Sequence, residues 1–285
     1  AGGATDAFAR IVAQKLSGYM GQPVVIDNRA GGNSVIGTDF VAKAQPDGYT
    51  LLLNPASHLT VPFFNKKMPY DAVKDFTPII AAAYNNRCIV VHPSLPVQNL
   101  TELIAYAKKN PGKLSYGSAG AGSLTHLTME LFKQQVNSFM VHIPYRGIAP
   151  AFTDLNGGQT QTMFPGLAAA VPHIRSGRVL PLAVTGMQRH PLFKDVPTLD
   201  ESGFKGFDAQ QWYGVVGPAG MPAPIVKHIN DAIAQVLAQP DFRDKLSAEA
   251  VELTPMTPNQ FLEYMKRDLA RWTDLARERK INLDA

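Results

Sequence analysis

Patterns typical of helices and of strands alternate along this 285-residue chain, and the alternation strongly constrains its fold. Residues 6–20 predict a helix with one apolar face, because apolar side chains recur there at helical spacing. That face carries Phe8, Ile11, Val12 and Leu16. The β-branched runs at 23–27 and 88–93 predict strands. Short loops between such segments predict an α/β fold with mostly parallel sheets covered by helices.

The alternation of helix and strand patterns continues over the rest of the chain. It predicts roughly ten strands, which fit two α/β units better than one sheet. After the strand at 212–218 only helices are expected, which suits a first domain completed late, after the chain has left it and returned. Further strands are expected within 46–54, 113–117, 139–145, 160–164, 179–184 and 212–218, and further helices at 35–44, 99–112, 124–135, 223–238, 241–248 and 258–279.

One of these helices has well-marked ends. Asn99 and Glu102 have the spacing of a capping box, in which side chains at a helix start accept hydrogen bonds from unpaired backbone N–H groups. The Pro-Gly pair at 111–112 ends the helical pattern. We therefore expect a helix that begins close to Asn99.

Charge and cysteine content exclude several classes of protein. The net charge of +4 is spread along the chain without a Lys/Arg block, so nucleic-acid binding is not expected. The single cysteine, Cys88, cannot form an internal disulfide or a cysteine metal cluster, and its apolar surroundings predict a buried side chain. No stretch approaches 18 consecutive apolar residues, the length that indicates a membrane span.

Motifs of common enzyme classes are also missing from the sequence. It has no P-loop, no G-x-S-x-G and no H-E-x-x-H. We expect neither a metal nor a cofactor, since the histidines lack the spacing of metal ligands. Asp6 is a candidate general base or an acid that satisfies helix N–H groups, and His126 is a candidate ligand contact or a packing residue. The seven histidines are His58, His92, His126, His142, His173, His190 and His228.

Three glycine-rich loops, at 1–6, 30–34 and 117–123, each precede an expected helix. Helix N-termini carry unpaired N–H groups and a partial positive charge, and both attract anions such as carboxylates. Glycine allows the backbone to approach a ligand closely. Each loop taken alone fits a plain strand-to-helix turn that carries capping residues better than a ligand site.

Two further segments follow expected strands. In "HIPYRG" (142–147), Arg146 stands near a strand end, where ligands of α/β proteins collect and where arginine can pair with a carboxylate. A surface ion pair is the alternative for Arg146. Ser57, in "NPASHL" (54–59), has a comparable position.

Longer blocks of the sequence carry a family likeness. The N-terminal block "AGGATDAFARIVAQKLSGYMGQPVVIDNRAGGNSVIGTDFVAKAQPDGYTLLL" closely resembles that of the Bug receptors, the substrate-binding proteins of tripartite tricarboxylate transporters. The likeness continues in the family's order over nearly the whole chain. Its later blocks are "YGSAGAGSLTHLTMELF", "VHIPYRG", "APAFTDLNGGQ", "RVLPLAVTG", "DVPTLDESGF" and "WYGVVGPAGMPAPIVKHIN".

The resemblance implies a fold and a place of action. It implies a two-domain periplasmic-binding-protein (Venus flytrap, type II-like) α/β fold, with a ligand cleft between the domains. Domain 1 would be discontinuous, with residues 1–90 and 212–285, and domain 2 would span 91–211. The protein is then expected to be a monomeric periplasmic receptor that delivers a small organic carboxylate to membrane components of a tripartite tricarboxylate transporter.

The resemblance also implies which residues hold the ligand carboxylate. The first glycine loop and the glycine-serine loop of the second domain would grip it, and three further residues would line the cleft. Pro165 stands where many relatives have an aspartate, so a polar contact from that position is not expected. The implied ligand-binding residues are Gly2, Gly3, Thr5, Asp6, Ser57, Ser118, Gly122, Ser123, Arg146 and Phe164.

Relatives begin with a strand of the kind "IRLIVPF" before the first loop. We therefore expect the natural protein to carry a signal peptide and about 5–6 residues of strand before Ala1. Three functions remain open from the sequence. They are a receptor for a mono- or dicarboxylate, including aromatic or amino-acid-like acids, a ligand sensor that acts through a protein partner, and an α/β enzyme that uses His126 or Asp6 as base.

Overall fold

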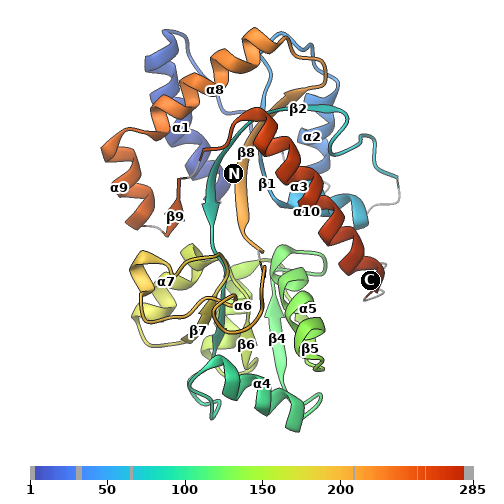
Figure 1. Cartoon of the computed structure of the whole chain (residues 1–285), viewed down its shortest axis with the longest axis vertical. Helices are drawn as coiled ribbons and strands as arrows, with labels where there is room; N and C mark the ends of the chain where they lie inside the picture. The colour runs from blue at the N-terminus through green and yellow to red at the C-terminus, as the bar shows by residue number, and fades with distance from the viewer. Residues whose placement is uncertain are drawn as a thin grey trace. The chain divides into compact units, whose positions relative to one another are not determined.

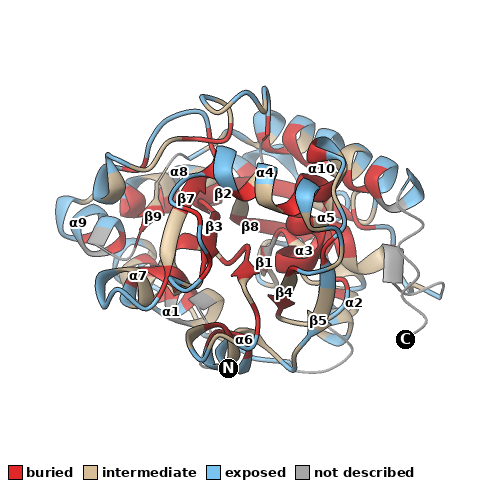
Figure 2. Ribbon diagram, turned by 90° about the horizontal axis from the view of Figure 1, so that it is seen from below, coloured by how far each residue is buried: buried red, intermediate tan, exposed pale blue. Residues whose placement is uncertain are grey.

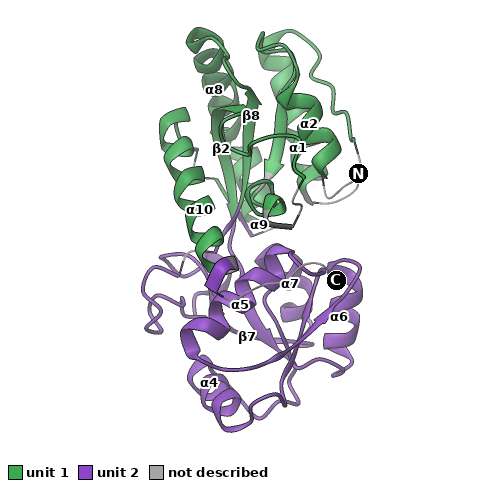
Figure 3. Cartoon of the chain, turned by 90° about the vertical axis from the view of Figure 1, so that its right-hand side faces the viewer, with its two compact units in different colours: residues 1–84, 212–247, 252–276 green, residues 85–211, 248–251, 277–285 purple. Residues whose placement is uncertain are grey.

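The computed structural model describes residues 4–29, 34–64, 67–207, 209–248, 250–253 and 255–278, and the chain divides into two units (Figure 3). Each unit has its own sheet with helices around it (Figure 1). Unit 1 comprises Ala1–Tyr84, Trp212–Ser247 and Glu252–Ala276, and unit 2 comprises Asn85–Gln211, Ala248–Val251 and Arg277–Ala285.

The sheet of unit 1 has the strand order β1-β8-β2-β9. β1 (Leu52–Pro55) runs antiparallel to β8 (Gln211–Pro218). β2 (Phe76–Asn85) is buried along almost its whole length and lies between β8 and the short β9 (Val251–Glu252). The helical segments are α1 (Ala4–Met20), α2 (Val35–Ala42), α3 (Ser57–Thr60), η2 (Val61–Phe64), α8 (Ala223–Leu237), α9 (Pro240–Ala248) and α10 (Pro258–Glu278).

The apolar face predicted for the first helix is confirmed in α1 for three of its four residues, and Ile11 is half-buried. Phe8, Val12 and Leu16 are all buried, with at most 6% of their surface exposed. The Phe8 ring stacks on Tyr213 of β8, with ring centroids 5.4 Å apart. Burial of these side chains removes apolar surface from water and holds the helix on the sheet.

Helix α10 packs on the same strand, β8. The indole Nε1 of Trp212 donates a hydrogen bond to Oδ2 of Asp268 at 3.2 Å. Trp212 also meets Phe261 edge to face, with ring centroids 5.2 Å apart. Gly214 leaves the space that the Phe261 ring occupies, since a Cβ there would overlap with it. This packing joins β8 to a helix formed much later in the sequence.

Unit 2 has a five-stranded sheet with the order β5-β4-β6-β3-β7. β4 (Ser115–Ser118) runs parallel to β5 (Val141–Pro144) and to β6 (Thr162–Met163). β3 (Cys88–Val91) runs antiparallel to β6 and to β7 (Leu180–Val184). The sheet is therefore mixed, and the expectation of mostly parallel sheets is wrong. The helical segments are α4 (Leu100–Lys109), α5 (Leu124–Val136), α6 (Ile148–Asn156), α7 (Leu167–Arg175) and η3 (Pro191–Phe193).

The capping signal of α4 is confirmed in detail. Asn99 has extended backbone angles, and its side chain accepts a hydrogen bond from the Glu102 N–H at 2.9 Å. The Glu102 carboxylate accepts in turn from the Gln98 N–H at 2.7 Å, one residue before the expected partner. Both bonds satisfy backbone donors that the helix itself leaves unpaired.

Three segments differ from the sequence-based expectation. Only helices were expected after residues 212–218, but the short strand β9 (Val251–Glu252) follows there, because pairing within the unit 1 sheet and not a local pattern forms a strand of this length. Residues 23–27 form no strand, and Val25 is 80% exposed, because a β-branched run forms a strand only where another strand pairs with it. The long central strand β2 was not predicted, since Pro78 and the three alanines 81–83 carry little strand propensity. The other expected strands and helices are present with shifted ends.

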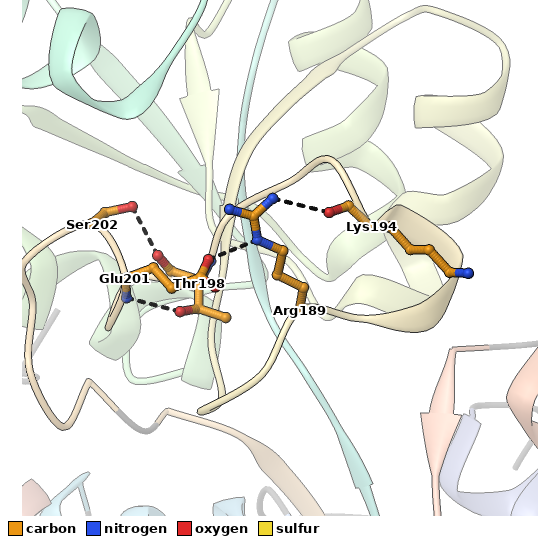
Figure 4. A network of polar contacts seen from close by, with 5 residues as sticks. All are labelled: Arg189, Lys194, Thr198, Glu201 and Ser202. Atoms are coloured by element: carbon orange, nitrogen blue, oxygen red, sulfur yellow. Dashed lines mark hydrogen bonds and ion pairs between the residues drawn. The ribbon is translucent and has the colours of Figure 1, made fainter.

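A polar network holds the segment after β7 (Figure 4). The Thr198 hydroxyl accepts from the Glu201 N–H at 2.9 Å, and the Glu201 carboxylate accepts from the Thr198 N–H at 3.0 Å. Arg189 donates to that carboxylate at 2.8 Å and to the Lys194 carbonyl at 3.1 Å, and Ser202 donates to the Thr198 carbonyl. These bonds, together with the packing of Phe193 and Val196 on the core of unit 2, hold a segment that has no regular strand.

Burial follows the sheets in both units. Strand residues outside β5 are mostly buried, and most helices expose one face, whereas α5 is buried along almost its whole length (Figure 2). In unit 2, Val90, Met163 and Val184 from three strands share a core with Phe152 and Leu155 of α6. This core holds the strands whose following loops carry the candidate residues of unit 2.

Candidate functional site

The glycine-serine loop between β4 and α5 holds most of the candidate residues in unit 2. Ser118 is the last residue of β4, and Ser123 is the N-cap of α5, with its Oγ 3.4 Å from the His126 N–H. Gly120 and Gly122 have φ angles of 121° and 79°. Only glycine adopts such angles without strain, so the sequence pattern fits this turn.

The loop is held by hydrogen bonds within itself. The Ser118 Oγ accepts from the Gly120 N–H at 3.1 Å, and the Ala119 N–H donates to the Thr125 Oγ1 at 2.9 Å. The Ser123 hydroxyl donates to the Gly120 carbonyl at 2.6 Å. The serine hydroxyls therefore form part of the hydrogen-bonded framework of the loop.

Two histidines, His126 and His142, lie against this loop and stack on each other. Their rings are nearly parallel, with centroids 4.0 Å apart. The Gly122 N–H donates to Nδ1 of His126 at 3.0 Å, and Nε2 of His142 lies 2.6 Å from the Ser118 Oγ. Burial lowers the pKa of His126, and burial together with the neighbouring His126 lowers the pKa of His142 to about 4.

A buried ion pair lies beside the histidine stack. Lys133 and the Tyr116 hydroxyl both donate to Oε1 of Glu130, each at 2.5 Å. Burial pushes the pKa of Glu130 upward, but the hydrogen bonds from Lys133 and Tyr116 outweigh it and hold the pKa below its usual value. Tyr116 lies directly opposite His142 in the parallel pair of β4 and β5, which joins the ion pair to the stack.

Arg146 lies next to the loop in the backbone hydrogen-bond pattern. The N–H of its neighbour Tyr145 donates to the Ser118 carbonyl at 3.1 Å. The Arg146 side chain is exposed, and within the described part of the chain it makes no hydrogen bond or ion pair. The structure thus brings Ser118, Gly122, Ser123 and Arg146 together at one edge of the unit 2 sheet.

The candidate residues of unit 1 are only partly described. Gly2 and Gly3 lie outside the described residues, and Thr5 is in the first turn of α1. Asp6, also in that turn, pairs with Arg10 at 3.1 Å and accepts from Asn28 at 2.8 Å. Since this carboxylate is negative and already bonded, it suits a role in holding the chain better than direct contact with an anion.

The last two candidate residues, Ser57 and Phe164, lie in a short helix and in the core. Ser57 is the first residue of the four-residue helix α3 and is partly exposed. Phe164 has no exposed surface, and its ring lies 6.3 Å from Phe132 and 6.0 Å from Phe207. As a core residue of unit 2, Phe164 offers its ring no surface for a ligand.

The sequence did not single out His142, Tyr116 and Glu130 as members of this site. A weak signal was present, because Tyr116 and Ser118 are two residues apart on one strand and so point to the same face. No group of three His, Cys, Asp or Glu side chains among the described residues is placed to hold a metal ion. No described helix is long and apolar enough to cross a membrane.

Fold and sequence together place the chain in a class of receptors. A family model described as "Tripartite tricarboxylate transporter family receptor" matches residues 8–281. The fold is that of two-domain periplasmic binding proteins, which are solute receptors and not enzymes. The chain belongs to the tripartite tricarboxylate transporter receptor family and is similar to Bug-type proteins.

One curated relative illustrates the likeness. The chain is 35% identical over 279 residues to the protein BugT of Bordetella pertussis, a match that covers 97% of this chain and 86% of BugT.

Solved structures agree with this membership. The periplasmic binding protein BugD has a TM-score of 0.82 and 34% identity, over 99% of this chain and 95% of BugD. The protein Rpa4515 of R. palustris, solved with adipate, has a TM-score of 0.84 and 35% identity, over 97% and 93% of the two chains. MatC of Rhodopseudomonas palustris, solved with malate, has a TM-score of 0.80 and 29% identity, over 96% and 95%.

Proposed function

We propose that this receptor captures a small organic carboxylate and that the loop of residues 118–123 in unit 2, with Arg146, receives the carboxylate group. The observation that carries the proposal is the exposed Arg146 side chain, which has no polar partner among the described residues and lies next to the hydrogen-bonded loop at the start of α5. Two structural relatives were solved with adipate and with malate, which supports a dicarboxylate as the ligand.

The chemistry of this edge suits an anion. The N-terminus of α5 carries a partial positive charge, which favours a negative group within the first turn. A guanidinium presents a planar fork of donors that fits a carboxylate with two parallel hydrogen bonds. Because Gly122 already donates its N–H to His126, we assign it the role of shaping the loop rather than of direct donation.

The proposal includes a contribution from the N-terminal segment. Gly2, Gly3 and Thr5 precede or begin α1, whose N-terminus has the same preference for anions. Asp6 would hold that segment through Arg10 and Asn28, and Ser57 would add a hydroxyl. Water-bridged contacts would complete the recognition of the acid.

We further propose that the protein acts in the periplasm as a monomer and delivers its ligand to the membrane components of a tripartite tricarboxylate transporter. The family membership supports this role, since the matching model describes the receptors of these transporters. Ligand-induced change in such a receptor would be what the membrane partner detects.

A thermal-shift screen of mono- and dicarboxylates tests the proposal. A bound acid raises the unfolding temperature by mass action, so one or a few acids, with adipate and malate as the first probes, should stabilise the protein. Arg146→Gln should reduce the shift strongly, because it removes the charge that faces the acid. Arg175→Gln is the matched control, since it removes an exposed arginine from the last turn of α7 in the same unit.

Either of two results would contradict the proposal. If no acid in the panel stabilises the wild-type protein, carboxylate capture is wrong. If Arg146→Gln and Arg175→Gln keep the same shift with the stabilising acid, the site is in the wrong place although the ligand class is right.

A further inference from the structure

The stacked histidines His126 and His142 come from different elements and support the two ends of the loop of residues 118–123. His126 lies in the first turn of α5, and His142 lies on β5. His126 is 7% exposed, so its polar atoms depend on protein partners. What these two rings bond to decides what they can do for the loop.

The bond to Gly122 fixes the tautomer of His126. Nδ1 of His126 accepts the Gly122 N–H at 3.0 Å, and an imidazole nitrogen that accepts a hydrogen bond carries no proton. The ring is therefore neutral, with its proton on Nε2. Gly122 has a φ of 79°, and the histidine bond stabilises the backbone in that turn.

The second ring acts on the other end of the loop. Nε2 of His142 lies 2.6 Å from the Ser118 Oγ, which also accepts the Gly120 N–H. Ser118 has a single hydroxyl proton, so the protonation of His142 decides whether that proton points to the histidine or to the Gly120 carbonyl. Both ends of the loop thus depend on the state of an imidazole.

The charged and titratable groups around the stack favour neutral rings. On α5, Lys133 and the positive N-terminus of the helix oppose an imidazolium, whereas Glu130 would favour one. The Glu130 carboxylate is already bonded to Lys133 and to the Tyr116 hydroxyl of β4. From β5, the second histidine, His142, faces His126, and two imidazolium rings 4.0 Å apart would repel each other.

We propose that His126 is a positioning residue for ligand capture, which holds Gly122 through its unprotonated Nδ1, while Nε2 of His142 contacts the Ser118 hydroxyl at the other end of the loop. The inference rests on the proposed role of the loop as the carboxylate site. It makes the loop geometry, and with it the affinity for the acid, depend on His126 staying neutral.

Protonation would act on the loop directly. A proton on Nδ1 of His126 would point at the Gly122 N–H, and the hydrogen bond would be replaced by a repulsion between two donors. The loop would leave its present conformation, and the ligand would bind more weakly. Because burial lowers the pKa of both rings, this loss develops at acidic pH and not near neutrality.

Nuclear magnetic resonance of the ligand-free, full-length protein tests the inference without reference to any ligand. Long-range correlations between ring protons and nitrogens report the tautomer of each histidine. We expect His126 to carry its proton on Nε2 at neutral pH, and the Gly122 amide resonance to shift together with the His126 ring on acidification. A proton on Nδ1 at neutral pH, or a Gly122 amide that ignores the His126 titration, would overturn the proposal.

Binding measurements with adipate as the probe add a functional readout. His126→Asn keeps an acceptor oxygen close to the position of Nδ1 but cannot take up a proton, whereas His126→Phe keeps a flat ring without the acceptor. We expect His126→Asn to bind nearly as well as wild type at neutral pH and His126→Phe to bind about tenfold more weakly, the effect of one buried donor left unpaired.

The pH profile separates positioning from a merely structural role. The ratio of the Kd of a variant to that of wild type at each pH cancels the titration of adipate itself. This ratio should fall for His126→Asn as the pH drops, because only wild type loses its Gly122 bond. His173→Asn is the control, since His173 is a histidine of α7 in the same unit with a lowered pKa and a bond to Asn156.

The outcomes are distinguishable from failure of the proposed function. If His126→Phe binds adipate with the affinity and pH profile of wild type, the positioning role is wrong. If wild type itself does not bind adipate or any other acid of the screen, the proposed function fails. In that case the magnetic resonance experiment still tests the His126–Gly122 hydrogen bond, because it needs no ligand.

Discussion

Buried histidines in both units are the side chains whose protonation at acidic pH would place a charge inside the protein. His58 in unit 1 is 5% exposed, and its Nε2 donates to the Ala72 carbonyl at 2.8 Å, while its Nδ1 has no partner among the described residues. Burial lowers the pKa of His58 to about 4, because an imidazolium there would add a donor with nothing to accept it.

The pH dependence of stability follows from this shift. As the pH falls, a histidine in the unfolded chain, with a pKa of 6.5, takes up its proton before the folded one does. The contribution of His58 to the free energy of unfolding is therefore largest above pH 6.5 and is lost as the pH drops towards about 4. The loss for His58 is on the order of 3 kcal/mol. His58→Phe, which keeps a ring between Tyr70 and Phe76, should flatten this part of the profile in urea titrations, at a cost of about 1 kcal/mol at neutral pH.

The matched control for His58→Phe is a variant of an exposed histidine in the same unit. His228 lies exposed on α8, so His228→Phe makes the same replacement outside the core of the unit. A slope of stability against pH for His58→Phe equal to that of wild type would mean that His58 is not the group that resists protonation.

The loop serines yield a second prediction at this scale. Replacing Ser118 and Ser123 with alanine removes the hydroxyls that bond Gly120, and with them the N-cap of α5. Each lost neutral bond should weaken ligand binding by roughly 0.5–1.5 kcal/mol, measured by titration calorimetry. Ser176→Ala, at the exposed C-cap of α7, is the control, and undiminished affinity in the double variant would refute the role of the loop.

At the scale of elements, the contact between β8 and α10 depends on a glycine, Gly214, at the position where the helix approaches the strand. The Phe261 ring of α10 occupies the space above Gly214, and Trp212 lies beside it. Gly214→Ala would force the ring, the helix or the strand to move. We expect a loss of about 1–3 kcal/mol in the free energy of unfolding, measured by denaturant titration.

Gly18→Ala is the paired variant for that experiment. Gly18 lies exposed within α1, and nothing lies within 4 Å of an added Cβ. Removing a helical glycine there should stabilise the protein by roughly 0.5–1 kcal/mol. Equal effects from the two variants would contradict the packing of α10 on β8.

Elements with local signals were predictable from the sequence. Asn99 and Glu102 determine where α4 begins, and the glycines of residues 117–123 determine the loop before α5, because capping and positive φ angles are properties of a few adjacent residues. β2 carries no such signal, since its conformation depends on the strands on both sides of it. The contact of Tyr116 with His142 depends equally on the pairing of β4 with β5, which no local pattern encodes.

At the scale of the whole molecule, Cys88 offers a reporter of opening. It lies in β3 with no exposed surface, and burial raises the pKa of its thiol. A thiol reagent should therefore label the chain only as fast as unit 2 opens. A stabilising acid should slow the labelling in proportion to its occupancy, measured by mass spectrometry. Fast labelling of the folded protein, at the rate seen in urea, would contradict the buried position.

The division of the chain into units also has a consequence for the order in which a growing polypeptide can fold. Unit 2 is mostly one continuous stretch, Asn85–Gln211, whereas β1 must pair with β8, which is synthesised only after that stretch. During synthesis unit 2 can close while β1 and β2 still lack their partner and leave strand edges open to other chains. The part of the protein that is made earlier thus belongs to the unit that folds later.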